Sequence, residues 1–176
     1  REAGAIQETL RRLLRMVVSR DERMLTLAER HLTLEDLLGV RRRMIGTGLL
    51  GGKSVGMLVA RAILRQAGGR WDEILEPHDS FFVGSDVFYS YLVNNGCWRL
   101  RQQQRDSDSF LQDVERAQEQ MLSGSFPEPV RYQFMEMLDY FGQAPIVVRS
   151  SSLLEDRIGH AFSGKYESVF CANQGT

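Results

Sequence analysis

The sequence predicts a helix-rich α/β domain with a few strands. Apolar residues recur every three or four positions over most of the chain, which is typical of amphipathic helices. Short β-branched or aromatic runs occur in only a few places, at residues 80–84, 144–149 and 166–170. The 176 residues are 43% hydrophobic, which suits one compact domain or two small lobes with a core.

The charge balance and cysteine content exclude several classes of protein. With 22 basic and 23 acidic residues, the chain has no general attraction to nucleic acid or to an anionic membrane. Two cysteines are too few for a disulfide framework, and no apolar run approaches the length of a membrane span. We therefore expect a cytoplasmic protein that binds neither nucleic acid nor membrane. Because the chain begins at Arg1 rather than Met, we also expect an excerpt of a longer protein.

Helical spacing accounts for most of the first 70 residues. An amphipathic helix is predicted over residues 5–18, and Thr33 with Asp36 three positions later resembles a capping box that starts a second helix. A glycine-rich turn follows, and residues 54–67 form a third helix that ends at Gly68 and Gly69. Lys53 and Ser54 therefore lie at a helix N-terminus.

The second half of the chain mixes helices with short strands. Residues 80–84 are a candidate buried strand, and Ser85 or Asp86 can cap the helix that follows it. Residues 144–149 predict a buried strand that ends in Arg149, and residues 166–170 alternate like a strand or hairpin arm. Further helices are predicted over residues 86–96, 108–124 and 130–142.

The glycine-rich turn resembles a P-loop but lacks its spacing. With Lys53 and Ser54 in place, the pattern G-x-x-x-x-G-K-[ST] needs glycine at position 47, which is Thr47. Residues 37–44 also read as helix or loop rather than as the buried strand that precedes a P-loop. The turn can still bind an anion through the amides and dipole of the following helix, or it can be a flexible turn that allows close packing.

Two further segments could contact phosphate, and each has a structural alternative. Arg149 and the serines that follow it can form a phosphate clamp, or Arg149 can pair with Glu155 or Asp156 as an internal brace. The segment 162–165 can form a flexible lid over phosphates, or it can be an ordinary hairpin turn. The basic cluster at residues 41–43 can be a solvated face or an additional phosphate contact.

Four segments in order resemble one known family. They read "LLGGKSVGMLVARAIL", "EPHDSFFVGSDVFYSYLVNNG", "FPEPVRYQFMEMLDYFGQAPIVVRSSSLLED" and "AFSGKYESVF". They are similar to the N-terminal, nucleotide-binding half of the family that includes phosphoenolpyruvate synthase, pyruvate phosphate dikinase and rifampicin phosphotransferase. The resemblance covers residues 44–176, and it leaves residues 1–43 as an N-terminal helical extension.

The resemblance implies part of an ATP-grasp-like nucleotide-binding domain. In that fold ATP and Mg²⁺ lie between two lobes, and a phosphoryl group passes to a histidine on a swivelling domain of the same parent chain. By position, Lys53 and Arg149 match the family's phosphate-contacting lysine and arginine. The other implied contacts to the ATP phosphates are Gly51, Gly52, Ser163, Gly164 and Lys165. Ser163 and Lys165 replace the family's usual alanine and glutamine, which changes the polarity of the lid.

The resemblance also implies what the excerpt lacks. The family's acidic metal ligands belong to a second lobe, so we assign no metal ligand and no catalytic residue here and expect the excerpt alone to be inactive. His31, His78 and His160 are isolated and are expected to be structural or solvent-facing. An alternative function is a non-catalytic nucleotide-sensing or protein-interaction module derived from the same lobe. The phosphate acceptor and the oligomeric state stay open.

Overall fold

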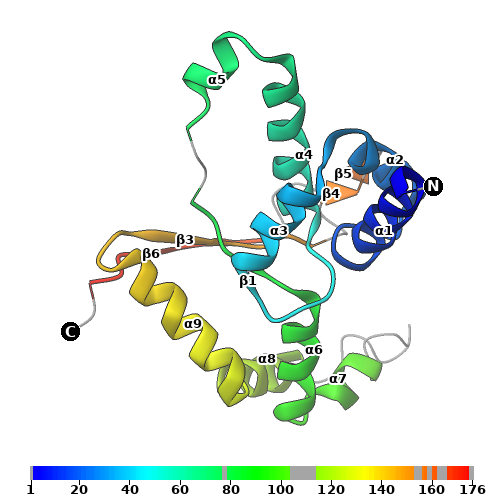
Figure 1. Ribbon diagram of the computed structural model, residues 1–176. Helices are drawn as coiled ribbons and strands as arrows, with labels where there is room; N and C mark the ends of the chain where they lie inside the picture. The colour runs from blue at the N-terminus through cyan, green and yellow to red at the C-terminus, as the bar shows by residue number, and fades with distance from the viewer. Residues whose placement is uncertain are drawn as a thin grey trace.

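The computed structural model describes residues 2–76, 79–103, 114–152, 156–157, 160–161 and 166–174. The predicted helix-rich α/β class is confirmed, since helices dominate the described chain and the strands are few and short (Figure 1). None of the described helices is long and apolar enough to cross a lipid bilayer.

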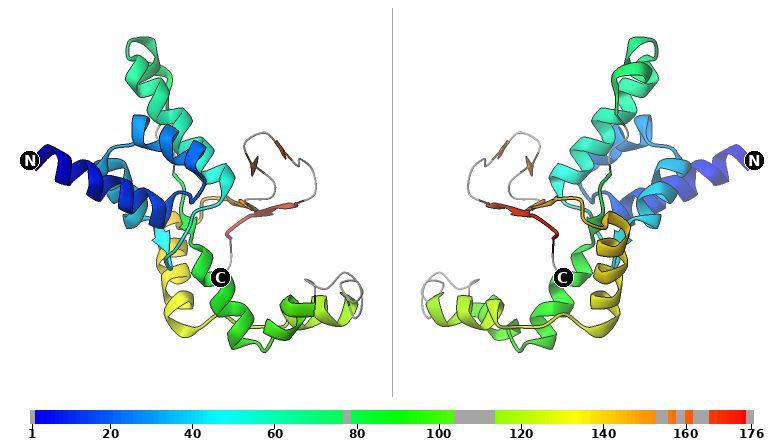
Figure 2. Two further views of the ribbon diagram at one scale, coloured as in Figure 1. Left: turned by 90° about the vertical axis from the view of Figure 1, so that its right-hand side faces the viewer. Right: turned by 90° about the vertical axis from the view of Figure 1, so that its left-hand side faces the viewer.

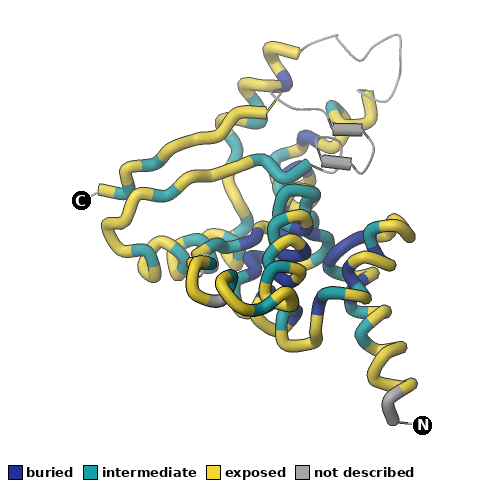
Figure 3. Tube along the Cα trace, turned by 90° about the horizontal axis from the view of Figure 1, so that it is seen from above, coloured by how far each residue is buried: buried dark blue, intermediate teal, exposed yellow. Residues whose placement is uncertain are grey.

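The N-terminal helices pack with α4 around one hydrophobic core. These helices are α1 (Glu2–Val17), α2 (Glu22–His31), α3 (Leu34–Arg42) and α4 (Gly52–Ala67). Dark blue segments in Figure 3 gather where they meet. The core residues are Leu14, Val18, Leu25, Ala28, Leu32, Leu37, Val40, Met44, Leu50, Val55, Leu58, Val59, Ala62 and Phe82. The helices of residues 1–43 therefore share their core with the segment that follows the glycine turn.

Local capping explains where two of these helices begin. The Asp21 carboxylate accepts hydrogen bonds from the amides of Arg23 and Met24 at the start of α2. At the start of α3, Thr33 and Asp36 form the predicted capping box, in which each side chain accepts from the other residue's amide. These polar contacts satisfy amides that have no partner inside the helix.

A short parallel pair of strands leads into the glycine turn and into α6. β1 (Met44–Ile45) pairs with β2 (Phe82–Val83), so a strand is present within the predicted residues 80–84, but only Phe82 of its two residues is buried. The expectation that no buried strand precedes the turn is wrong, because Met44 and Ile45 are both buried and form β1. A strand of two residues is too short to produce a detectable sequence period. The spacing argument against a P-loop is unaffected, since position 47 is Thr47.

The remaining helices lie on the other side of the β1–β2 pair, apart from α5 (Arg70–Ile74), which follows α4 (Figure 1). Three of them agree with the predicted helices, although residues 104–113 lie outside the described part of the chain. The three are α6 (Ser85–Asn94), α8 (Val114–Leu122) and α9 (Glu128–Phe141). The fourth, α7 (Trp98–Gln103), was not predicted. The ring of Phe126 packs between those of Tyr91 and Phe134, with centroids 4.8 and 5.1 Å away.

The C-terminal strands form an antiparallel ribbon. β3 (Ile146–Arg149) pairs with β6 (Ser168–Cys171), with Arg149 opposite Ser168, and the short β4 (Asp156–Arg157) pairs with β5 (His160–Ala161). The predicted strand ending in Arg149 is present, but the expectation that it is buried is wrong. Phe170 is 83% exposed and Val148 55%, because the described residues leave the ribbon largely uncovered (Figure 2).

Candidate functional site

The glycine turn is fixed by the first residues of α6. The amide of Thr47 donates to Asp86 Oδ1 over 2.6 Å, and the amide of Leu49 donates to Ser85 Oγ over 3.0 Å. The Ser85 amide in turn donates to the carbonyl oxygen of Leu49 over 3.1 Å. Gly48 has φ +87°, a conformation that favours glycine because it has no Cβ. The turn is therefore a shaped and anchored loop.

These contacts correct the role predicted for Ser85 and Asp86. The N-cap of α6 is Gly84, and no side chain caps that helix. The hydroxyl of Ser85 and the carboxylate of Asp86 instead accept hydrogen bonds from amides of the glycine turn. The amides at the start of α6 and the amides of the glycine turn both need acceptors. Sequence spacing cannot show which of them a side chain will reach.

The start of α4 meets the segment that follows β3. Ser151 Oγ accepts a hydrogen bond from the Ser54 amide over 3.1 Å and lies 3.2 Å from Ser54 Oγ. These residues are 97 positions apart in the sequence. Two of the predicted phosphate-binding segments, at residues 51–54 and 149–152, are thus in contact.

Gly51 also packs closely against Ser151. A Cβ built on Gly51 would lie 1.3 Å from the carbonyl oxygen of Ser151 and 2.4 Å from its Oγ. No side chain fits there without separating the two backbones. The close-packing explanation of the turn therefore applies at Gly51, and it is compatible with anion binding by the amides that follow.

The contact places both predicted phosphate-binding cations at the same junction. Lys53 is the second residue of α4 and is partly buried, whereas Arg149 is the last residue of β3 and is exposed. Ser151 follows Arg149 by two residues, so the Cα atoms of Arg149 and Ser151 are at most about 7 Å apart. The start of α4 and the end of β3 can therefore act on one ligand. Whether Arg149 pairs with Glu155 or Asp156 depends on side chains outside the described part.

The other predicted site residues are placed only in part. Gly52 is the first residue of α4, while Ser163, Gly164 and Lys165 lie outside the described residues. Among the described residues, no group of three or more His, Cys, Asp or Glu side chains could hold a metal ion.

The three histidines are also placed in part. His31 Nδ1 lies 2.7 Å from Gln66 Oε1 and links α2 to α4, in keeping with the structural role expected of it. His78 is outside the described residues, and His160 belongs to β5.

Arg43 braces three segments. Its guanidinium pairs with Asp79 and donates to Tyr140 Oη over 3.1 Å, and Tyr140 Oη donates to Asp79 over 2.9 Å. The hydrogen bond to Asp79 raises the pKa of Arg43 above its ordinary value. The guanidinium also lies 5.2 Å from the Tyr140 ring centroid. Arg43 is therefore held to α9 and the segment before β2, a role that the sequence did not indicate.

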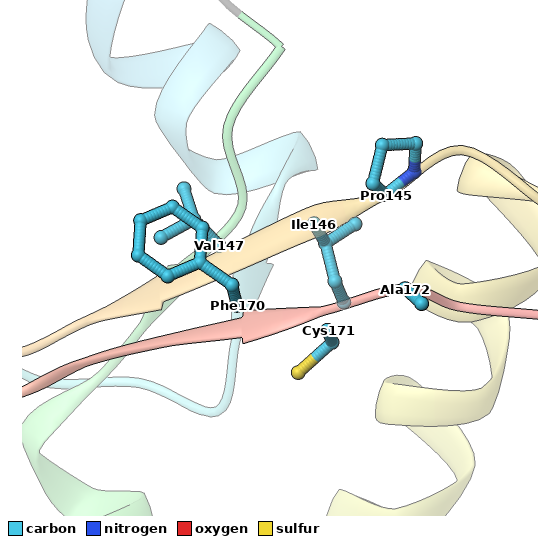
Figure 4. A pocket seen from close by; sticks show the side chains of 6 residues that line it. All are labelled: Pro145, Ile146, Val147, Phe170, Cys171 and Ala172. Atoms are coloured by element: carbon cyan, nitrogen blue, oxygen red, sulfur yellow. The ribbon is translucent and has the colours of Figure 1, made fainter.

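Two hollows of the described chain lie away from the α4–β3 junction. One, of about 470 Å³, is formed by both strands of the exposed ribbon; its lining residues are Pro145, Ile146, Val147, Phe170, Cys171 and Ala172 (Figure 4). The other, of about 690 Å³, lies between α3 and α4 and includes Arg42, Arg61 and Arg65. Neither hollow is lined by Lys53 or Ser151.

An anchored glycine turn at a helix start, joined to a strand that ends in arginine, is an arrangement that can bind phosphate. The family model described as "Pyruvate phosphate dikinase, AMP/ATP-binding domain" matches residues 47–176. This match covers most of the chain, and the chain belongs to that family. No curated protein and no solved structure matches the chain significantly. The matched region begins at residue 47, whereas the shared core extends back to Leu14.

Proposed function

We propose that the junction of α4 and β3 binds the phosphates of ATP for a dikinase-type phosphotransferase. The observation that carries the proposal is the contact between Ser54 and Ser151, which joins residues 51–54 to the end of the strand that carries Arg149. The chain that contains this contact belongs to an AMP/ATP-binding family. In this proposal Lys53, Arg149 and the amide of Gly52 hold the phosphates. Ser163, Gly164 and Lys165 cover them, and Mg²⁺ is bound by acidic residues of a second lobe.

The residues suit phosphoryl transfer chemically. The reaction breaks the bond between a phosphorus and its bridging oxygen and forms a new bond from that phosphorus to a histidine nitrogen. Its demands on a protein are chiefly alignment and neutralisation of developing charge. Lys53 would supply a point charge, Arg149 a fork with two donors, and the N-terminus of α4 a partial positive charge. The acceptor histidine would belong to another domain of a cytoplasmic parent protein.

Titration of the full-length protein with ATP and Mg²⁺ tests the proposal. We expect Lys53→Ala and Arg149→Ala each to raise the Kd by at least about tenfold, since a charge-assisted hydrogen bond contributes roughly 1.5–3 kcal/mol. Arg131→Ala, on the exposed face of α9, is the control and should leave the Kd unchanged. Undiminished affinity in both site variants would refute the assignment.

The same preparation separates the two candidate functions. Incubation with ATP labelled at the transferred phosphate, followed by analysis for acid-labile phosphohistidine, reports the transfer. ATP binding with labelled histidine supports the phosphotransferase. ATP binding without any labelled histidine supports the alternative, a nucleotide-sensing or protein-interaction module.

A further inference from the structure

We propose that Ser151 is a positioning residue of this site, because its hydroxyl caps helix α4 from a distant part of the chain. The proposal has a structural part, the cap itself, and a functional part, which rests on the proposed binding of ATP. The sequence predicted the serines after Arg149 as part of a phosphate clamp, but it did not indicate that Ser151 would cap α4.

The start of α4 lacks a cap of its own. An N-cap residue such as Ser, Thr, Asp or Asn carries a side-chain oxygen that accepts from the amide two or three positions later. Here the N-cap is Gly51, which has no side chain, and no side-chain cap bond arises from that position. Intrahelical bonding begins with the amide of Val55, which donates to the carbonyl of Gly51 over 3.1 Å. The amides before Val55 therefore need acceptors from elsewhere.

Ser151 supplies that acceptor. Counting from the N-cap, Ser54 is the third helical residue, whose amide a capping side chain ordinarily receives. Ser151 Oγ accepts from this amide over 3.1 Å. A side chain at position 51 would overlap Ser151. The close approach of the two segments therefore excludes a capping side chain at position 51 and brings the Ser151 hydroxyl to the helix start. Glycine at position 51 and serine at position 151 form a matched pair.

The distant cap fixes the geometry in which Lys53 and Arg149 can share a ligand. Lys53 lies between Gly51 and Ser54, both of which contact Ser151, and Arg149 precedes Ser151 by two residues. The cap also determines which donor receives the anion. Since Ser151 takes the Ser54 amide, an incoming phosphate would accept from donors nearer the turn, such as the amide of Gly52. Loss of the Ser151 hydroxyl should therefore fix the positions of Lys53 and Arg149 less firmly. It should also leave the Ser54 amide without its acceptor.

The test compares Ser151→Ala with Ser151→Thr, which keeps a hydroxyl. Ser123→Ala is the matched control, because Ser123 is exposed and, within the described part of the chain, its hydroxyl donates to backbone carbonyls of α8. Two quantities are measured in the full-length protein: the hydrogen-exchange rate of the Ser54 amide without nucleotide, by NMR, and the Kd for ATP with Mg²⁺, by calorimetry. The exchange rate reports the cap itself, whether or not nucleotide binds.

We expect Ser151→Ala to speed exchange at Ser54 by about fivefold, as for the loss of a cap worth ~1 kcal/mol, and to raise the Kd for ATP by at least about fivefold. Ser151→Thr should stay within about twofold of wild type in both, and Ser123→Ala should match wild type. Unchanged exchange or unchanged affinity in Ser151→Ala would overturn the inference. If wild type fails to bind ATP, the proposed function fails, and the exchange rate alone then decides the existence of the cap.

Discussion

Two glycines near the start of α4 differ sharply in their surroundings. A Cβ on Gly51 would lie 1.3 Å from the Ser151 carbonyl oxygen, whereas a Cβ on Gly56 would meet no atom within 4 Å. We therefore expect Gly51→Ala to separate α4 from the segment after β3 and to weaken ATP binding by more than about tenfold, as misplacement of a binding group can. Calorimetric titration of the full-length protein measures the change.

Gly56→Ala is the control for this substitution. Gly56 is an exposed residue in the interior of α4, where alanine is favoured over glycine by about 0.5–1 kcal/mol. We expect it to raise the free energy of unfolding by about that amount in urea denaturation and to leave the Kd for ATP unchanged. Tight ATP binding by Gly51→Ala would show that the close approach to Ser151 is dispensable.

At the scale of elements, the first turn of α3 carries a pH-sensitive contact. Partial burial raises the pKa of Asp36, but hydrogen bonds from the Thr33 amide and from Arg65 outweigh it, so the pKa lies below its ordinary value of 3.8. The folded state thus favours the charged carboxylate. Its contribution to stability is complete above the ordinary pKa and is lost as the pH falls through the lowered one.

Substitution of Asp36 should therefore flatten the acid side of the stability profile. We expect Asp36→Asn to be less stable than wild type at neutral pH and to lose less stability between about pH 5 and about pH 2. Arg65→Met should show part of this effect, because Arg65 donates to Asp36 over 2.6 Å. Urea unfolding at a series of pH values measures both. An Asp36→Asn profile as steep as that of wild type would exclude Asp36 as the source.

A substitution in the buried face of α2 tests whether the N-terminal helices belong to the same folding unit as α4. Leu25 is fully buried in the shared core, whereas Leu38 on α3 is 50% exposed. We expect Leu25→Ala to lower the free energy of unfolding by about 2–5 kcal/mol, the usual range for a cavity in a core. Leu38→Ala should change it by no more than about 0.5 kcal/mol. Urea denaturation measures both values.

The hydrogen exchange of α4 in these variants reports the coupling directly. If the helices of residues 1–43 formed a separate unit, Leu25→Ala would leave the protection of the Leu58 and Val59 amides unchanged. A shared core requires that protection to fall together with the global stability. The predicted division between residues 43 and 44 would then describe the limits of sequence similarity rather than of folding.

For the whole molecule, what the sequence reveals depends on the range of the interaction. The helical periods of α1, α4 and α9 and the Thr33–Asp36 capping box are local, and all of them were predicted. The two-residue β1 was missed because it is too short to show a period. The exposure of β3 was missed because a β-branched run does not indicate whether another layer covers it.

The arrangement of the site depends on contacts that no local pattern encodes. The resemblance to a nucleotide-binding family paired Lys53 with Arg149, but the contact that joins their segments came only from the structure. Gly51 has no capping side chain, and the Ser151 hydroxyl supplies the cap of α4 instead. Nothing in the sequence indicated that Ser85 and Asp86 would hold the glycine turn rather than cap their own helix.

The separation between Ser54 and Ser151 also has a consequence for the order of folding. Helices and their local caps form from neighbouring residues, whereas a contact across 97 positions must first close a long loop, at an entropic cost that grows with loop length. The α4–β3 junction should therefore assemble late. During synthesis, Lys53 leaves the ribosome long before the segment that contains Ser151 exists. A chain interrupted before Ser151 would therefore carry the glycine turn but could not form the proposed phosphate site.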